Sequence, residues 1–233
     1  MIPDDFAVAG MHRLTTLDYP GLVSAIVFTQ GCNFHCPYCH NPHLIPSGNG
    51  ASALDMAELF AFLEKRAGLL DGLVISGGEP TLQAGLEAFC RAVKGLGYRI
   101  KLDTNGSRPE TLRRLLDNGL LDYVALDCKT LPERYYPGLC PEPDVERNFR
   151  ETLALLAAYG VEHEFRTTCV SPWVEPDMTA LLAHPEWDAP WFLQRANLDQ
   201  AMLHRGLQAL TTDAMRAMAD EAKTLGVQTT LRS

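Results

Sequence analysis

Apolar and polar residues alternate along this chain in blocks that predict strands and helices in turn. Short apolar runs of strand length are separated by longer segments in which apolar residues recur with the period of an amphipathic helix. The expected strands are 22–29, 73–76, 99–104, 123–127, 164–170 and 191–194, with a terminal strand at 227–231. The expected helices are 56–67, 82–96, 109–118, 144–159, 176–182 and 213–225.

Several predicted helix ends carry local signals. Asp55 precedes the helix 56–67, with Glu58 three residues later, which is the pattern of a capping box. Pro109 stands in the first turn of another helix, and Gly160 follows the end of the helix 144–159. These signals support the strand and helix order that the apolar pattern predicts.

Six strands in strand-helix order predict a parallel sheet covered by helices, and such units in succession curl towards a barrel. We therefore expect an α/β fold, a partial (β/α)6 barrel of the TIM type. The length of 233 residues is near the lower limit for a barrel, and no linker rich in Ser, Gly or Pro separates two halves. Residues 1–233 are expected to form a single domain.

The predicted strands end in polar residues, which matters because parallel α/β folds bind ligands at the carboxyl ends of their strands. Any one of these residues could be a helix cap or a rim charge, but their convergence on one edge favours a site. From the second strand to the sixth, the residues concerned are Gly77 to Pro80, Asp103, Thr104, Asn105, Asp127, Lys129, Arg166 to Thr168, Gln194 and Arg195.

Cys32, Cys36 and Cys39 form a CxxxCxxC motif directly after the first strand. Three thiolates suit an iron-sulfur cluster that keeps one iron free to bind something else. The alternative is a structural zinc site with His35 or His40 as fourth ligand. Structural zinc usually has two pairs of ligands, and the sequence contains no second CxxC or HxxxH pair. The spacing therefore favours a cluster.

A second motif, Gly77-Gly78-Glu79-Pro80, lies on a predicted strand-to-helix turn. Two glycines there allow a ligand to approach the backbone closely. Alone it would be an ordinary turn, but together with CxxxCxxC upstream it resembles the radical S-adenosylmethionine superfamily. That resemblance implies a 4Fe-4S cluster on the three cysteines, whose open iron is chelated by the methionine amine and carboxylate of S-adenosylmethionine.

Within this superfamily the sequence is most similar to glycyl radical enzyme activating proteins, over nearly the whole chain. The similar segments are 16–21 (TLDYPG), 38–42 (YCHNP) and 102–106 (LDTNG). More narrowly, the segments 163–168 (HEFRTT) and 192–194 (FLQ) resemble activating proteins of anaerobic ribonucleoside-triphosphate reductases.

The resemblance implies a role for each matching residue. Gly77, Gly78 and Glu79 would meet the methionine end of the cofactor, and the backbone near Tyr38 would meet the adenine. Asp103, Thr104 and Asp127 match positions that surround a monovalent cation in a related activator. Asn105, Lys129, Arg166 and Gln194 would neighbour the cofactor. Asp18 would face the glycine loop of a partner enzyme, although an Asp-Tyr-Pro-Gly turn explains it equally well.

The implied reaction is reductive cleavage of S-adenosylmethionine to methionine and a 5′-deoxyadenosyl radical, which abstracts a glycine Cα hydrogen. The expected target is the anaerobic (class III) ribonucleoside-triphosphate reductase. No cysteine lies between His40 and Leu73, so the cysteine-rich insertion of some activators is absent. The electron would then come from an external donor such as flavodoxin or ferredoxin.

Other readings of the sequence stay open. The chain could activate a different glycyl radical enzyme, or act on a small molecule as a 7-carboxy-7-deazaguanine synthase does. A zinc-stabilised binding module would leave the polar strand ends unexplained. A redox carrier would not require the glycine turn.

Composition and charge narrow the remaining choices. The net charge of -9 argues against binding along a nucleic acid backbone. The N-terminus lacks a signal-peptide pattern, and no apolar run is long enough to span a membrane, so a cytoplasmic protein is expected. The four cysteines outside the motif are expected to be buried free thiols, as in a reducing compartment. They are Cys90, Cys128, Cys140 and Cys169.

Overall fold

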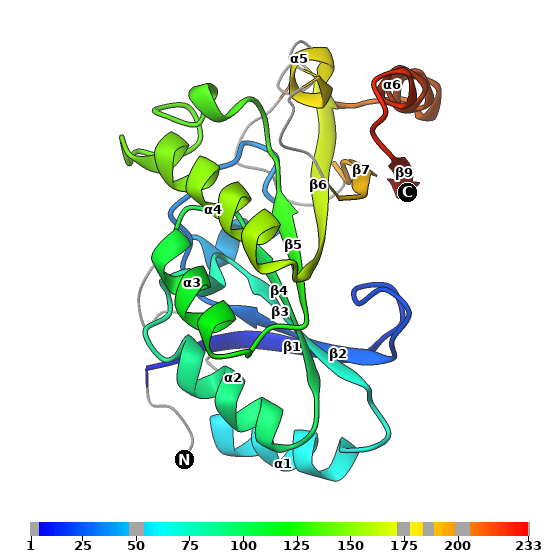
Figure 1. Cartoon of the computed structure of the whole chain (residues 1–233). Helices are drawn as coiled ribbons and strands as arrows, with labels where there is room; N and C mark the ends of the chain where they lie inside the picture. The colour runs from blue at the N-terminus through cyan, green and yellow to red at the C-terminus, as the bar shows by residue number, and fades with distance from the viewer. Residues whose placement is uncertain (1–4, 47–53, 172–177, 184–188, 199–205, 233) are drawn as a thin grey trace.

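One curved sheet organises the fold, with its strands in the order β1-β2-β3-β4-β5-β6-β7-β9 and β8 paired to β6 outside this order (Figure 1). The computed structural model describes residues 5–46, 54–171, 178–183, 189–198 and 206–232. The strands are β1 Val8–Thr15, β2 Ser24–Thr29, β3 Gly72–Gly77, β4 Arg99–Thr104, β5 Tyr123–Asp127, β6 Glu162–Ser171, β7 Trp191–Arg195, β8 Gln208–Ala209 and β9 Thr229–Arg232. The helices are α1 Met56–Arg66, α2 Leu86–Gly95, α3 Pro109–Asp117, α4 Val145–Tyr159, α5 Met178–Leu182 and α6 Thr212–Thr224.

The sheet is parallel from β2 to β7 and on to β9, which confirms the predicted partial α/β barrel. Two antiparallel pairings were not predicted: β1 with β2, and the short β8 with β6. Within the described residues, β1 and β9 end the sheet on either side, so the barrel is open.

Most predicted boundaries agree with the structure to within two residues. The Asp55 side chain caps α1 by accepting a hydrogen bond from the Ala57 N–H, and Gly160 ends α4 in the left-handed conformation. The helix predicted to begin at residue 82 begins later, at Leu86, because a 3-10 turn at Pro80–Leu82 comes first. Residues 176 and 177 of the predicted helix 176–182 lie outside the described residues.

The two faces of the sheet differ in chemistry. Helices α1 to α4 lie along the outer face, where alternate strand residues are apolar (Figure 1). Val27, Ile75, Leu102 and Leu126 pack there in the main core, together with apolar side chains of the helices. On the inner face, Tyr19, Ile26 and Val74 form a small apolar cluster of their own. Its remaining positions hold many of the polar residues described below.

No helix in the described part of the chain is long and apolar enough to span a membrane. The longest, α4, has 15 residues, whereas a spanning helix needs roughly 20.

A candidate active site at the carboxyl ends of the parallel strands

A cavity of about 210 Å³ lies where β2 to β7 end, and its wall contains the predicted cluster and cofactor residues. All of the residues predicted to bind the cluster, the cofactor or the cation contribute to this wall. Asp18, which was expected to face a partner enzyme, lines neither this cavity nor the one beside it. The convergence follows from the parallel order, which places the carboxyl ends of neighbouring strands at one edge.

The cysteine motif forms a loop on one side of the cavity, directly after β2. Cys36 is buried, and Cys32 and Cys39 are half-buried. Burial raises the pKa of the Cys32 thiol to about 12 and that of Cys36 to about 11. The thiolates that bind metal are therefore unfavourable in this environment unless a metal compensates their charge.

The number of ligands distinguishes an iron-sulfur cluster from a zinc ion. Among the described residues, no three His, Cys, Asp or Glu side chains are placed so that they could hold a metal ion. A zinc site would need four such ligands around one atom, whereas a cubane cluster binds each thiolate at a different iron. The three cysteines all line the cavity, and the choice of a cluster over zinc rests on the spacing of the motif.

The glycine turn packs directly against the cysteine loop. Gly77 has a φ of 121°, which a residue with a side chain rarely adopts. A Cβ atom on Gly78 would lie 2.0 Å from the Gly31 carbonyl oxygen. The Glu79 N–H donates to that same oxygen at 2.8 Å. The neighbouring backbone therefore requires a glycine at position 78, whatever the cavity binds.

The Glu79 side chain is used inside the protein. Its Oε1 accepts hydrogen bonds from the backbone and hydroxyl of Thr81 and from Thr104 Oγ1, at 3.1, 2.5 and 2.7 Å. Its Oε2 accepts from the Asn105 N–H at 2.7 Å. Burial raises the pKa of Glu79, and these donors oppose that shift. The carboxylate therefore acts as a clamp between the glycine turn and the end of β4.

Asn105 is also committed to protein contacts. Its side-chain amide donates to Asn33 Oδ1 at 3.0 Å, and its carbonyl oxygen accepts from the Ser107 N–H. Asn33 lies in the cysteine loop between Cys32 and Cys36. Asn105 thus joins the cysteine loop to the loop after β4, a structural role that the sequence motif did not indicate.

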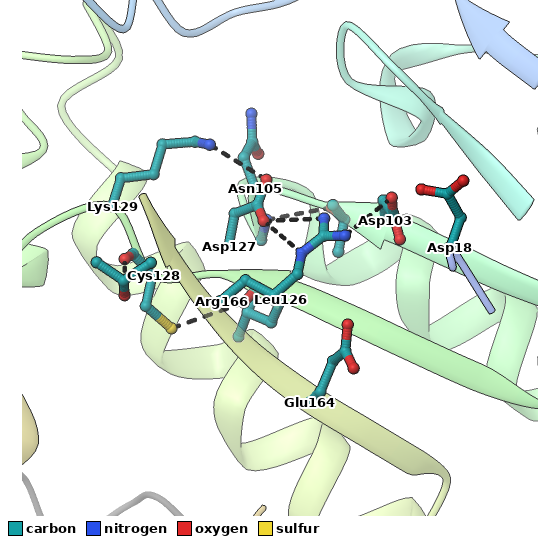
Figure 2. Close-up of polar contacts among 12 residues, drawn as sticks. Asp18, Asp103, Asn105, Leu126, Asp127, Cys128, Lys129, Glu164 and Arg166 are labelled. Carbon is teal, nitrogen blue, oxygen red and sulfur yellow. Dashed lines mark hydrogen bonds and ion pairs between the residues drawn. The ribbon is translucent and has the colours of Figure 1, made fainter. Parts of the chain in front are cut away.

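A network of charged side chains from β4, β5 and β6 also lines the cavity and is called the charged wall below (Figure 2). Arg166 of β6 reaches both Asp103 of β4, at 3.1 Å, and Asp127 of β5, at 2.9 Å. Lys101 Nζ lies 3.0 Å from Asp103, and Lys129 Nζ lies 3.2 Å from Asp127. Burial opposes ionisation of the two carboxyls, but the charge of Arg166 and of the lysines outweighs it and lowers the pKa of both.

The monovalent cation that the resemblance suggested would compete for this wall with side-chain cations. Both carboxylates already have cationic partners, as described above. The Thr104 hydroxyl donates to Glu79 and accepts from the Gly106 N–H. All three residues suggested to surround a cation thus have partners within the protein, but Asp103 Oδ1 is buried without a hydrogen-bond donor and has only the nearby charge of Lys101.

Tyr38 and Gln194 complete the predicted set. Tyr38 is buried, and its hydroxyl donates to the Lys129 carbonyl at 3.3 Å. Gln194 lies on β7 opposite Thr168 of β6, and both side chains line the cavity. The structure gives neither of the two an additional role.

Asp18 lies in the loop between β1 and β2. Its carboxylate accepts from the Thr15 hydroxyl, and its backbone carbonyl accepts from Lys101 Nζ at 2.6 Å. The hydrogen-bonded turn in this loop runs from Tyr19 to Leu22, one residue later than the Asp-Tyr-Pro-Gly turn. Lys101 therefore tethers this loop to Asp103. Its position two residues before Asp103 on one strand, and so on the same face, was a signal that we overlooked.

A second cavity of about 540 Å³ adjoins the first and was not predicted. The two share His40 and Asn41, which follow the third cysteine. Gly10, His12 and Phe28 of β1 and β2 line the second cavity at the free edge of the sheet.

The four remaining cysteines are buried free thiols, as expected.

Comparison with known proteins agrees with this geometry. Residues 26–180 match the family described as "Radical SAM superfamily". A Methanocaldococcus jannaschii protein named for glycyl-radical enzyme activation is 37% identical over 70% of this chain and 68% of its own length. A pyruvate formate-lyase-activating enzyme of Listeria monocytogenes is 34% identical over 55% of each chain, so the match spans about half of that relative.

Solved structures support the fold. QueE from Escherichia coli aligns over 98% of this chain and 94% of its own, with a TM-score of 0.57 and 14% identity. A domain of a pyruvate-formate lyase-activating enzyme from Bacteroides vulgatus aligns over 70% of this chain and 99% of its own, with a TM-score of 0.53 and 16% identity. The family match and the M. jannaschii relative go further than fold. The chain belongs to the radical SAM superfamily, as a member of its glycyl-radical enzyme activating enzymes.

Proposed function

We propose that this chain installs a glycyl radical on a partner enzyme, most specifically an anaerobic ribonucleoside-triphosphate reductase. The observation that carries the activase function is the 37% identity to a relative named for glycyl-radical enzyme activation. The cavity supports it, because the three cysteines and the glycine turn face one space with the charged wall. Membership of the superfamily implies a 4Fe-4S cluster and S-adenosylmethionine in that space.

When bound, the cluster and S-adenosylmethionine would supply an electron and the radical that abstracts the hydrogen. This chain's own residues do the rest. The three cysteines would hold the cluster, and the hydrogen-bonded junction of Gly31 with Glu79 fixes the cysteine loop against the glycine turn. The charged network would orient an anionic part of the cofactor, and the enclosing strand ends would limit access of water to the reacting atoms.

The second cavity offers a route for the partner. It opens at the free edge of the sheet beside β1 and meets the first cavity at His40 and Asn41. We infer that a glycine-bearing segment of the partner enters there. An extended backbone could reach the cofactor by this route without passing through the helices on the outer face.

The identity of the partner rests on the segment 163–168 and on the absence of cysteines between His40 and Leu73. The inward residues of this segment, Glu164, Arg166 and Thr168, lie on the cavity face of β6 rather than on an exposed surface. The similarity of this segment to activators of the reductase therefore concerns the wall that faces the cofactor, and not a surface that contacts the partner. The choice of the reductase as partner is a proposal that goes beyond this similarity.

Electron paramagnetic resonance tests the function. The chain would be incubated anaerobically with S-adenosylmethionine, a one-electron reductant and the reductase, and we expect a glycyl doublet on the reductase. A reductase variant with the radical glycine replaced by alanine is the matched control. No doublet on any glycyl radical enzyme, together with consumption of the radical by a small molecule, would overturn the proposal.

A second candidate partner is pyruvate formate-lyase, because the Listeria relative at 34% identity carries that function in its name. The same experiment separates the two candidates. A doublet on the formate-lyase alone would leave the activase function standing and exclude the reductase.

A further inference from the structure

The strongest unexplained feature of the site is the way in which its charged wall is compensated. Asp103 and Asp127 end neighbouring strands and are largely enclosed, with side chains 9% and 28% exposed. Two carboxylates in such a wall need nearby positive charge if both are to stay ionised. In many sites that charge would be a metal ion, and the sequence led us to expect one.

Here a side chain supplies the charge. Arg166 Nη1 donates to Asp103 Oδ2, and Arg166 Nε donates to Asp127 Oδ1, so one guanidinium bridges the two carboxylates (Figure 2). Of the outer oxygens, Asp127 Oδ2 accepts from Lys129, whereas Asp103 Oδ1 is buried without a hydrogen-bond donor and has only the charge of Lys101, 3.0 Å away. A metal ion held by both carboxylates would have to displace this guanidinium.

The side chains of the charged wall itself include more cations than carboxylates. In the described part of the chain, Asp103 and Asp127 face three cations, while Glu164, the next carboxylate along the inner face, is paired through both oxygens with Arg232. The charged wall therefore has one more cation than carboxylates, whereas Glu79, across the cavity on the glycine turn, is held by neutral donors. Arg166 and Lys129 both line the cavity, which places positive charge where an anionic group would be bound.

We propose that Arg166 is the built-in cation of this site, that it replaces a monovalent metal ion, and that it allows the carboxylate of S-adenosylmethionine to bind without any added ion. The proposal rests on the cofactor assigned under the proposed function but not on the partner enzyme. A guanidinium suits the task because its rigid fork bridges two carboxylates and stays charged at every working pH.

The test measures binding of S-adenosylmethionine to the reconstituted, unreduced protein by anaerobic equilibrium dialysis, without partner or turnover. Binding is compared in potassium chloride and in tetramethylammonium chloride at equal ionic strength. We expect the dissociation constant of the unchanged protein to differ by less than about twofold between the two salts. For Arg166→Met we expect about tenfold weaker binding in tetramethylammonium, comparable to loss of one charge-assisted hydrogen bond, and substantial recovery in potassium.

Two further variants make the result specific. Arg166→Lys keeps the charge but loses the fork, so its binding should be weakened and still independent of potassium. Arg99 is the exposed first residue of β4, at the end of the strand away from the cavity. Arg99→Met makes the same substitution there, and this variant should bind S-adenosylmethionine as the unchanged protein does. The melting temperature of each variant without its cluster shows whether it has folded, and it should depend on potassium only for Arg166→Met.

Potassium dependence of the unchanged protein by more than about fivefold would overturn the proposal, because an ion would then be needed despite Arg166. Weaker binding by Arg166→Met that potassium fails to restore would also overturn it. If Arg166→Met does not fold, the unchanged protein and Arg166→Lys still decide the matter. A protein that binds S-adenosylmethionine as expected but yields no glycyl radical would refute the proposed function alone.

Discussion

Replacing the Glu79 carboxylate should destabilise the fold itself. The loss of stability would show that Glu79 acts as a structural clamp, whereas a residue that only binds the cofactor could be replaced without it. In Glu79→Gln the amide oxygen can take only one of the two oxygen positions. If it stays with Thr81 and Thr104, the amide NH2 faces the Asn105 N–H, and two donors meet in a buried place. The Asn105 N–H then lacks an acceptor.

The size of the effect follows from these contacts. An unsatisfied buried donor costs about 1–3 kcal/mol, and the hydrogen bonds from Thr81 and Thr104 lose the charge of their acceptor. Together we expect a loss of about 2–4 kcal/mol in the free energy of unfolding, against a total of about 5–15 kcal/mol for a typical domain. For a chain of this length that corresponds to a fall of roughly 5–12 °C in melting temperature.

The assay is thermal unfolding of the protein without cluster or S-adenosylmethionine, followed by circular dichroism. Glu162→Gln is the matched control, because its side chain is 70% exposed and its loss should change stability by less than about 0.5 kcal/mol. If Glu79→Gln melts within about 2 °C of the unchanged protein and only binding of S-adenosylmethionine is weakened, Glu79 is a ligand and the clamp argument is wrong.

Two other changes test the cysteine loop. Replacing any one of the three motif cysteines by alanine should abolish a stable 4Fe-4S cluster, since the cluster already lacks a fourth protein ligand. Iron and sulfide analysis after anaerobic reconstitution checks this. Stoichiometric zinc without sulfide would refute it. Gly78→Val should lower cluster content as well as binding of S-adenosylmethionine. The reason is that the valine Cβ would lie 2.0 Å from the Gly31 carbonyl oxygen and so displace the cysteine loop. A full cluster with weakened cofactor binding would instead mean that the valine side chain only fills space needed by the ligand.

The sequence predicted well those features that depend on strand order. A parallel sheet brings strand ends together, so strand order alone was enough to assign residues as distant in the chain as Cys32, Asp103 and Gln194 to one site. The β1 strand was missed because it is an edge strand in which only Val8 is buried, so the apolar alternation that reveals a strand is weak.

The sequence did not show which way the side chains of the site point or which groups they contact. Glu79 and Asn105 carry groups that could bind a cofactor, and nothing in their local sequence shows that the Glu79 carboxylate also accepts a hydrogen bond from the Asn105 backbone N–H. Such contacts join loops that follow different strands, and they depend on the distance between those strands after folding. Lys101 was missed for a related reason, since a lysine inside a strand is rarely buried unless it is paired.

The contacts that the motif residues make with one another give the two motifs a common physical purpose. Gly31 accepts a hydrogen bond from the Glu79 backbone, Asn33 accepts one from Asn105, and Glu79 accepts one from Asn105 in turn. The cysteine loop, the glycine turn and the loop after β4 are therefore one hydrogen-bonded unit. If the unit is rigid, the position of a cluster on the first loop fixes its position relative to anything bound at the second. A change confined to Glu79 should then disturb the cluster as well as the cofactor, although Glu79 bonds to none of the three cysteines.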